Sequence, residues 1–268
     1  MGLKAKGVAL ILLMSCSTIS HAQQSAIGKL TGKAKSGKEL YRRYCIPCHG
    51  VYGDGAGESA PHLDPKPRDF TKATFKCRST PSGSLPTDSD LYDTISRGIY
   101  NSGMPPWKPL TRQQRADLIA YVKTFSTRFQ EEPAVASLSI PPEPPQSAES
   151  VHRGGELFQK MNCWSCHGKE GRGNGPSALT LTDNKGYPIL PFDLTQGSHF
   201  KCGETGSDLF KDLMTGLDGT PMPSFSTAMQ PDQIWDVVHY IQSLSQESNR
   251  GFFHFAKAES KPQESKPQ

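Results

Sequence analysis

Long apolar runs are scarce in this chain of 268 residues. The clearest one, residues 8–14, is too short to predict a membrane span, and no later stretch is apolar enough to cross a bilayer. No convincing alternating strand or hairpin turn appears either. A basic run with interleaved aromatic residues is lacking, which argues against nucleic-acid binding. No pair of carboxylates and no nucleophile–base arrangement supports a hydrolase.

Two pentapeptides carry the strongest chemical signal, Cys45-Ile46-Pro47-Cys48-His49 and Cys163-Trp164-Ser165-Cys166-His167. C-x-x-C-H is the attachment signature of c-type haem. Its two thiols lie one helical turn apart and form thioethers to one porphyrin edge, and the histidine then points its imidazole at the iron. The sequence therefore predicts two covalent haem c groups. The predicted attachment residues are Cys45, Cys48, Cys163 and Cys166, and the predicted first axial ligands are His49 and His167.

The two motifs belong to a longer repeat with an offset of 118 residues (163 − 45). A glycine-rich loop follows each histidine, and each half then carries a methionine beside proline, Met104 or Met222. The separation from histidine to methionine is the same in both halves (104 − 49 and 222 − 167). Thioether sulfur is a soft ligand that suits haem iron, and the neighbouring prolines fix the backbone that presents it. We therefore expect Met104 and Met222 to be the second axial ligands.

Other residues near these motifs have weaker assignments. Trp107 and Phe225 follow the two methionines at equivalent positions and are expected to pack on the haem. Pro61 and Pro176 follow the histidines. Each either offers a backbone carbonyl to the second imidazole nitrogen or simply forms a turn. The remaining histidines have no counterpart across the repeat and are interpreted as surface residues or neighbours of the ligands: His62, His152, His199, His239 and His254.

Helical patterns indicate two domains, at residues 36–127 and 152–247. In the first, a helix capped by Ser36 leads into the haem motif, and a last helix begins at Thr111, where Gln114 completes a capping box.

The second domain ends with a helix that begins at Pro231, a residue suited to the first helical turn. Residues 128–150 form a linker rich in proline, which favours a stiff, extended path. Residues 23–34 are expected to be a flexible leader, and residues 255–268, with a repeated Glu-Ser-Lys-Pro-Gln, a disordered tail.

A starting helix, C-x-x-C-H, a glycine-rich loop, a Met-Pro loop and a final amphipathic helix occur in this order, twice. This arrangement resembles class I cytochrome c in tandem, as in dihaem periplasmic cytochromes c. The resemblance implies an all-α fold wrapped round each haem, His/Met ligation and a redox partner protein. Haem also explains how a chain with 35% hydrophobic residues, 25 glycines and 22 prolines builds a core.

Residues 1–22 are typical of a secretory signal peptide, with Lys4 and Lys6 before the apolar run. Cleavage after Ala22 would release a soluble protein, whereas lipidation of Cys16 would attach it to a membrane. Either outcome predicts a periplasmic location, which agrees with haem attachment outside the bacterial cytoplasm in the proteins this chain resembles. Loss of the two lysines and addition of four haem propionates bring the formal charge of +4 close to neutral or slightly below.

Two cysteines remain after haem attachment. Phe75-Lys76-Cys77 and Phe200-Lys201-Cys202 match at an offset of 125 residues. Three interpretations stay open for Cys77 and Cys202: a disulfide that locks the two halves together, two small buried apolar residues, or a thiolate that replaces methionine on one iron.

The expected function is transfer of single electrons between redox partners of a bacterial respiratory or oxidative chain, because an iron with two axial ligands has no open position for a substrate. An electron-transfer subunit of a larger oxidoreductase has the same chemistry. The alternative is a dihaem redox enzyme of the peroxidase or thiosulfate dehydrogenase type, with Cys77 or Cys202 as the atypical ligand.

Overall fold

The computed structural model describes residues 26–28, 30–197 and 199–258, with backbone alone from residue 246 onward. The predicted signal peptide and Cys16 therefore lie outside the described residues. The elements follow this order: β1 Ala26–Ile27, β2 Leu30–Thr31, α1 Ala34–Tyr44, α2 Ile46–His49, η2 Ala60–His62, α3 Asp88–Arg97, α4 Arg112–Val122, η3 Lys123–Phe125, α5 Arg128–Glu131, α6 Ala148–Lys160, α7 Trp164–His167, η4 Ala178–Thr180, η5 Leu194–Gln196, α8 Gly206–Thr215 and α9 Pro231–Ala258.

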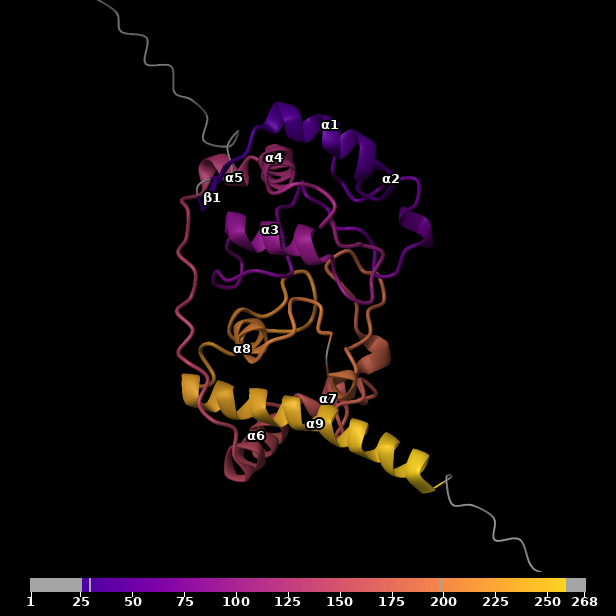
Figure 1. Cartoon of the computed structure of the whole chain (residues 1–268), viewed down its shortest axis with the longest axis vertical. Helices are drawn as coiled ribbons and strands as arrows, with labels where there is room; N and C mark the ends of the chain where they lie inside the picture. The colour runs from indigo at the N-terminus through magenta and orange to yellow at the C-terminus, as the bar shows by residue number, and fades with distance from the viewer. Residues whose placement is uncertain (1–25, 29, 198, 259–268) are drawn as a thin grey trace, which may run out of the picture.

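The predicted all-α fold is confirmed, since helices make up nearly all of the regular secondary structure in the described residues (Figure 1). Ala26–Ile27 and Leu30–Thr31, which the sequence assigned to a flexible leader, instead form the short antiparallel pair β1–β2. None of the described helices has the length and apolar character needed to cross a membrane.

Helix starts agree with the predicted caps in the later helices but not in the first. The capping box of Thr111 and Gln114 opens α4, and α9 begins at Pro231, both as predicted. Helix α1 begins at Ala34, because Lys33 and not Ser36 is its N-cap residue. The Lys33 backbone N–H donates to Asp117 Oδ1 of α4 at 2.8 Å, so a tertiary contact sets this helix start in place of a local cap.

In each half the first helix packs against the last, α1 on α4 and α6 on α9. A glycine lies at the closest approach of both pairs. A Cβ on Gly37 would meet the Asp117 carbonyl oxygen at 1.9 Å, and a Cβ on Gly154 would meet that of Asp236 at 2.0 Å. The helix crossing therefore depends on glycine in both halves, since any residue with a Cβ would keep the two backbones further apart.

Each half has its own hydrophobic core. Tyr41, Leu118 and Ile119 belong to the core of the first half, and Phe158 and Trp235 belong to that of the second. The two cores share no residue among the described clusters, which is the arrangement of two units that each bury an apolar face of their own.

The segment between the halves is extended, with α5 and the start of α6 at its ends. It runs along one side of the molecule (Figure 1). The Leu138 N–H donates to the Ser79 carbonyl at 2.8 Å, and Gln146 Nε2 donates to the His239 carbonyl at 3.1 Å, so the segment is fastened to both halves. At the far end α9 continues to Ala258, so residues 255–258 of the predicted tail are helical, and residues 259–268 lie outside the described residues.

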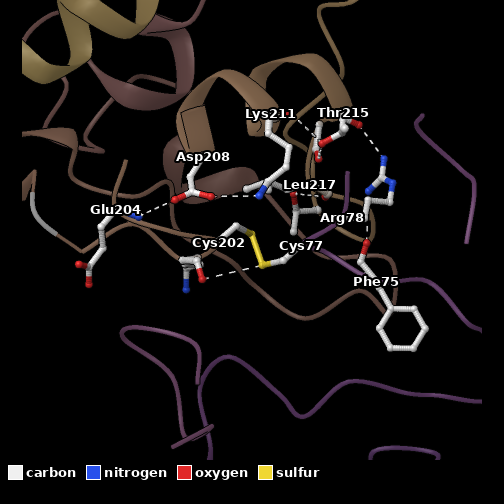
Figure 2. Close-up of a disulfide and its surroundings, with 12 residues drawn as sticks. Phe75, Cys77, Arg78, Cys202, Glu204, Asp208, Lys211, Thr215 and Leu217 are labelled. Atoms are coloured by element: carbon white, nitrogen blue, oxygen red, sulfur yellow. Dashed lines mark hydrogen bonds and ion pairs between the residues drawn. A yellow bond between two sulfur atoms is a disulfide. The ribbon is translucent and has the colours of Figure 1, made fainter. Parts of the chain in front are cut away.

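A disulfide between Cys77 and Cys202 joins the two halves, with the Cα atoms 5.2 Å apart (Figure 2). Of the three interpretations left open by the sequence, the structure shows the first. Arg78, the next residue, donates from its guanidinium to the Thr215 carbonyl at 2.6 Å and lies 2.8 Å from Asp218, both in the second half. Covalent and polar contacts thus hold the two halves in one arrangement.

Candidate haem sites

The structure brings each predicted set of four residues to the wall of one cavity. Cys45, Cys48, His49 and Met104 line the first cavity. In the second half the same four positions line another cavity: Cys163, Cys166, His167 and Met222. The two cavities are related by the repeat that the sequence contains.

Both cavities have the chemistry that a porphyrin needs on their walls. The space between the walls, with the open mouth included, is about 1290 Å³ in the first half and about 1500 Å³ in the second. The walls are mainly apolar, and all four motif cysteines are free. The residues present therefore fit a large apolar group with two thioether links.

Each motif histidine has its imidazole fixed by a backbone carbonyl. Nδ1 of His49 lies 3.1 Å from the Arg68 oxygen, and Nδ1 of His167 lies 3.1 Å from the Phe192 oxygen. Because a carbonyl only accepts, Nδ1 carries the proton and the Nε2 lone pair is left for a metal. Burial lowers the pKa of both histidines, which also favours the neutral ring.

These carbonyls correct the prediction for the prolines. Pro61 and Pro176 were candidates to hold the imidazoles, but Arg68 and Phe192 do so. The Pro61 carbonyl accepts from Lys66 Nζ at 2.9 Å instead. The holding residues lie on the long loops where the two halves differ in length, so the repeat at an offset of 118 residues could not reveal them.

The methionine loops have the same hydrogen bonds in both halves. The carbonyl of Met104 accepts from the Ile99 N–H at 3.0 Å, and that of Met222 accepts from the Leu217 N–H at 3.1 Å. A hydroxyl two residues earlier accepts from each methionine N–H, Ser102 in one half and Thr220 in the other. Such duplicated support of the backbone holds both thioethers at equivalent points of their cavities.

Aromatic side chains complete the walls. Trp107 lines the first cavity and Phe225 the second, as expected from their positions after the methionines. Phe70 stacks on the His49 ring with the centroids 4.4 Å apart. This contact, which the sequence did not reveal, restricts rotation of the imidazole.

The other described histidines line neither cavity. His62, His152 and His199 are exposed, whereas His239 is fully buried and lies 2.9 Å from the Ser150 hydroxyl. The expectation of a surface residue or ligand neighbour is therefore wrong for His239, which is part of the α6–α9 contact. His254 lies where only the backbone is described.

The cavity walls also carry charged groups that the sequence did not predict. Lys76 lines both cavities, and Lys201 and Asp212 line the second. Burial raises the pKa of Asp212 from 3.8 to about 7, and its Oδ1 has no hydrogen-bond partner among the described residues. The duplicated Phe-Lys-Cys tripeptide was a signal for the two lysines, because it repeats them along with the cysteines.

Comparison with known proteins agrees with this geometry. A family model described as cytochrome c matches residues 151–245, and one described as cytochrome C oxidase, cbb3-type, subunit III, matches residues 32–122. A chain of the reducing HAO-like protein complex of Kuenenia stuttgartiensis is similar in structure, with a TM-score of 0.77 and 44% sequence identity. The match covers 78% of this chain and 96% of that one.

Two curated relatives are more distant. The Cbb3-type cytochrome c oxidase subunit CcoP of Helicobacter pylori is 23% identical over 202 residues, which are 73% of this chain and 58% of that protein. The cytochrome bc1 complex cytochrome c subunit of Corynebacterium diphtheriae is 24% identical over 260 residues, 93% of this chain and 79% of that protein.

The two cavities and the matched families define a c-type cytochrome with a class I domain in each half. The chain belongs to the cytochrome c family. Membership implies covalently bound haem c and a role in electron transfer, as the names of the relatives from respiratory complexes indicate.

Proposed function

We propose that this protein carries two haem c groups and passes single electrons between redox partners. Cys45 and Cys48 would hold the first haem, between His49 and Met104. Cys163 and Cys166 would hold the second haem, between His167 and Met222. The two haem domains would span residues 36–127 and 152–247. When bound, the haem supplies a one-electron couple, and methionine ligation favours its reduced state. The observation that supports this proposal is that a histidine, a methionine and two free cysteines line each cavity.

The chain's own residues contribute orientation and exclusion of substrate. The carbonyls of Arg68 and Phe192 hold the imidazole rings, and the proline-flanked loops hold the thioethers. If histidine and methionine held each iron, electrons would pass without a change of ligands, which would keep reorganisation small. No metal position would then be open to a substrate.

The disulfide disfavours the alternative of a dihaem enzyme. Peroxidase or thiosulfate dehydrogenase chemistry was suggested by the two cysteines outside the haem motifs. Since Cys77 and Cys202 are bonded to each other, neither supplies a thiolate to an iron.

We further propose that the protein works as a subunit beside a larger oxidoreductase, because the similar chain from Kuenenia stuttgartiensis belongs to a reducing HAO-like protein complex. A periplasmic location follows from the leader, as a soluble chain or one anchored through Cys16. The mass of the mature protein distinguishes the two forms.

Haem counting tests this function. Pyridine haemochrome absorbance and intact mass of the purified protein should give two haems per chain. The methionine-to-iron band at the red end of the ferric spectrum should have the intensity of two thioether-ligated irons. A count of one haem, or a high-spin resting spectrum that reveals an open coordination position, would overturn the proposal.

A further inference from the structure

One lysine belongs to both cavities. Lys76 lies on the wall of the first cavity and on that of the second, whereas its repeat equivalent Lys201 lines the second alone. The residue is adjacent to Cys77, so the disulfide holds it at the junction of the two halves. The duplicated tripeptide has therefore acquired two different surroundings.

The Lys76 side chain is buried without a counterion. The residue is 8% exposed, and in the part of the chain that the structure describes its Nζ makes no hydrogen bond or ion pair. Burial, followed by repulsion from Lys201 and Arg68, lowers its pKa to about 7, and Asp183 offsets this only in part. Burial of an ammonium group is unfavourable unless an anion compensates its charge.

A haem bound in either cavity would supply that anion. Each haem carries two propionate carboxylates, and the walls of the first cavity offer cations but no carboxylate: Lys66, Arg68 and Lys76. The second cavity offers Lys76 and Lys201 together with Asp212. Because Lys76 is common to both walls, it is available to a carboxylate bound in either cavity.

We propose that Lys76 is a positioning residue shared by the two haem sites, where it compensates the propionates of both haems and raises the reduction potential of both irons, while Lys201 serves the second site alone. A nearby cation disfavours the oxidised iron, which carries one more positive charge than the reduced iron. This inference rests on the proposed dihaem function.

Spectroelectrochemical titration of the haem-loaded protein tests the assignment. Lys76→Gln should lower both midpoint potentials, whereas Lys201→Gln should lower only that of the haem at Cys163–His167. Lys76→Arg, which keeps the charge, should restore both potentials. Lys38→Gln removes a charge from an exposed lysine on α1 and should change neither. The two potentials are assigned in a Met104→His background, where the altered spectrum marks the first haem.

The outcomes separate the two levels of the proposal. Haem count and the methionine band are measured first on the unaltered protein, and failure there overturns the dihaem function itself. If two His/Met haems are present, a Lys76→Gln shift confined to one haem, or no larger than that of Lys38→Gln, overturns the shared role. If Lys76→Gln loads no haem, unchanged potentials in Lys201→Gln overturn the propionate assignment.

Discussion

Arg78 Nη2 lies 2.8 Å from Asp218 Oδ1, and the Arg78 side chain is completely buried between the two halves. The same guanidinium also donates to the carbonyls of Phe75, Pro81 and Thr215. One side chain thus satisfies three carbonyls and a carboxylate drawn from both halves of the molecule. A buried charge with this many partners is costly to remove, because each partner is left unpaired.

Replacement of this arginine tests how strongly the halves are coupled. Arg78→Met should lower the free energy of unfolding by about 3–5 kcal/mol, the range for breaking a buried ion pair. Urea unfolding of the haem-loaded protein measures the loss. Glu58→Gln removes an exposed charge and should change stability by less than about 0.5 kcal/mol. Equal effects of the two substitutions would contradict the buried role of Arg78.

The disulfide predicts a definite thiol count and a stability loss. The denatured, haem-loaded mature protein should show no free thiol before reduction and two after it, because thioether formation consumes the four motif cysteines and Cys16 is either removed with the leader or lipidated. The Cys77→Ser/Cys202→Ser double variant should lose about 2–5 kcal/mol, since the bond closes a loop with a sequence separation of 125 residues. A free thiol without reduction would rule the bond out.

Methionine ligation predicts a change of potential in one haem at a time. Met104→His should keep the haem attached, abolish half of the methionine band and lower the midpoint potential of that haem alone, because histidine stabilises the oxidised iron more than methionine does. Met222→His should do the same for the other haem. Met229→Leu serves as a control, since Met229 is buried in the second core and does not line the cavity. An unchanged potential would remove that methionine from the coordination shell.

Burial of Asp212 predicts a pH dependence of stability. Its pKa is raised from 3.8 to about 7, mainly by burial. A carboxyl whose pKa is higher in the folded state binds more protons there, so its contribution to stability is complete below about pH 4 and is lost as the pH rises to about 7.

Asp212→Asn should remove this dependence. Relative to the variant, the unaltered protein should lose stability between pH 4 and 7. The loss should be about 1.4 kcal/mol for each unit by which the pKa of Asp212 is higher in the folded than in the unfolded state. Urea unfolding at several pH values measures the difference, with the exposed Asp232→Asn as control. Parallel pH curves for Asp212→Asn and the unaltered protein would contradict the burial of this carboxyl.

The sequence carried enough information to predict the fold class and to name two sets of residues that the structure places on the walls of two cavities. C-x-x-C-H and the Met-Pro loops are local motifs whose chemistry is readable without coordinates, and the equal spacing in both halves restricted the alternatives. The capping box at Thr111 and the helix start at Pro231 were predictable for the same reason, because caps depend on residues within one turn.

The contacts that the sequence did not reveal are tertiary. Gly37 and Gly154 recur across the repeat, but only the helix crossing shows why another residue would clash. The carbonyls of Arg68 and Phe192 could not be recognised in the sequence, since every residue has a backbone carbonyl. The pairing of Cys77 with Cys202 required the distance between two domains, which no local pattern encodes.

The disulfide and the polypeptide together make a closed ring. Residues 77–202 begin and end at the same sulfur–sulfur bond, and the extended segment between α5 and α6 lies within this ring. A protease cut in that segment would therefore open the circle without separating its halves. The nicked protein should keep its two pieces together on a denaturing gel until a reductant is added, so a cut in this exposed stretch leaves the molecule covalently joined.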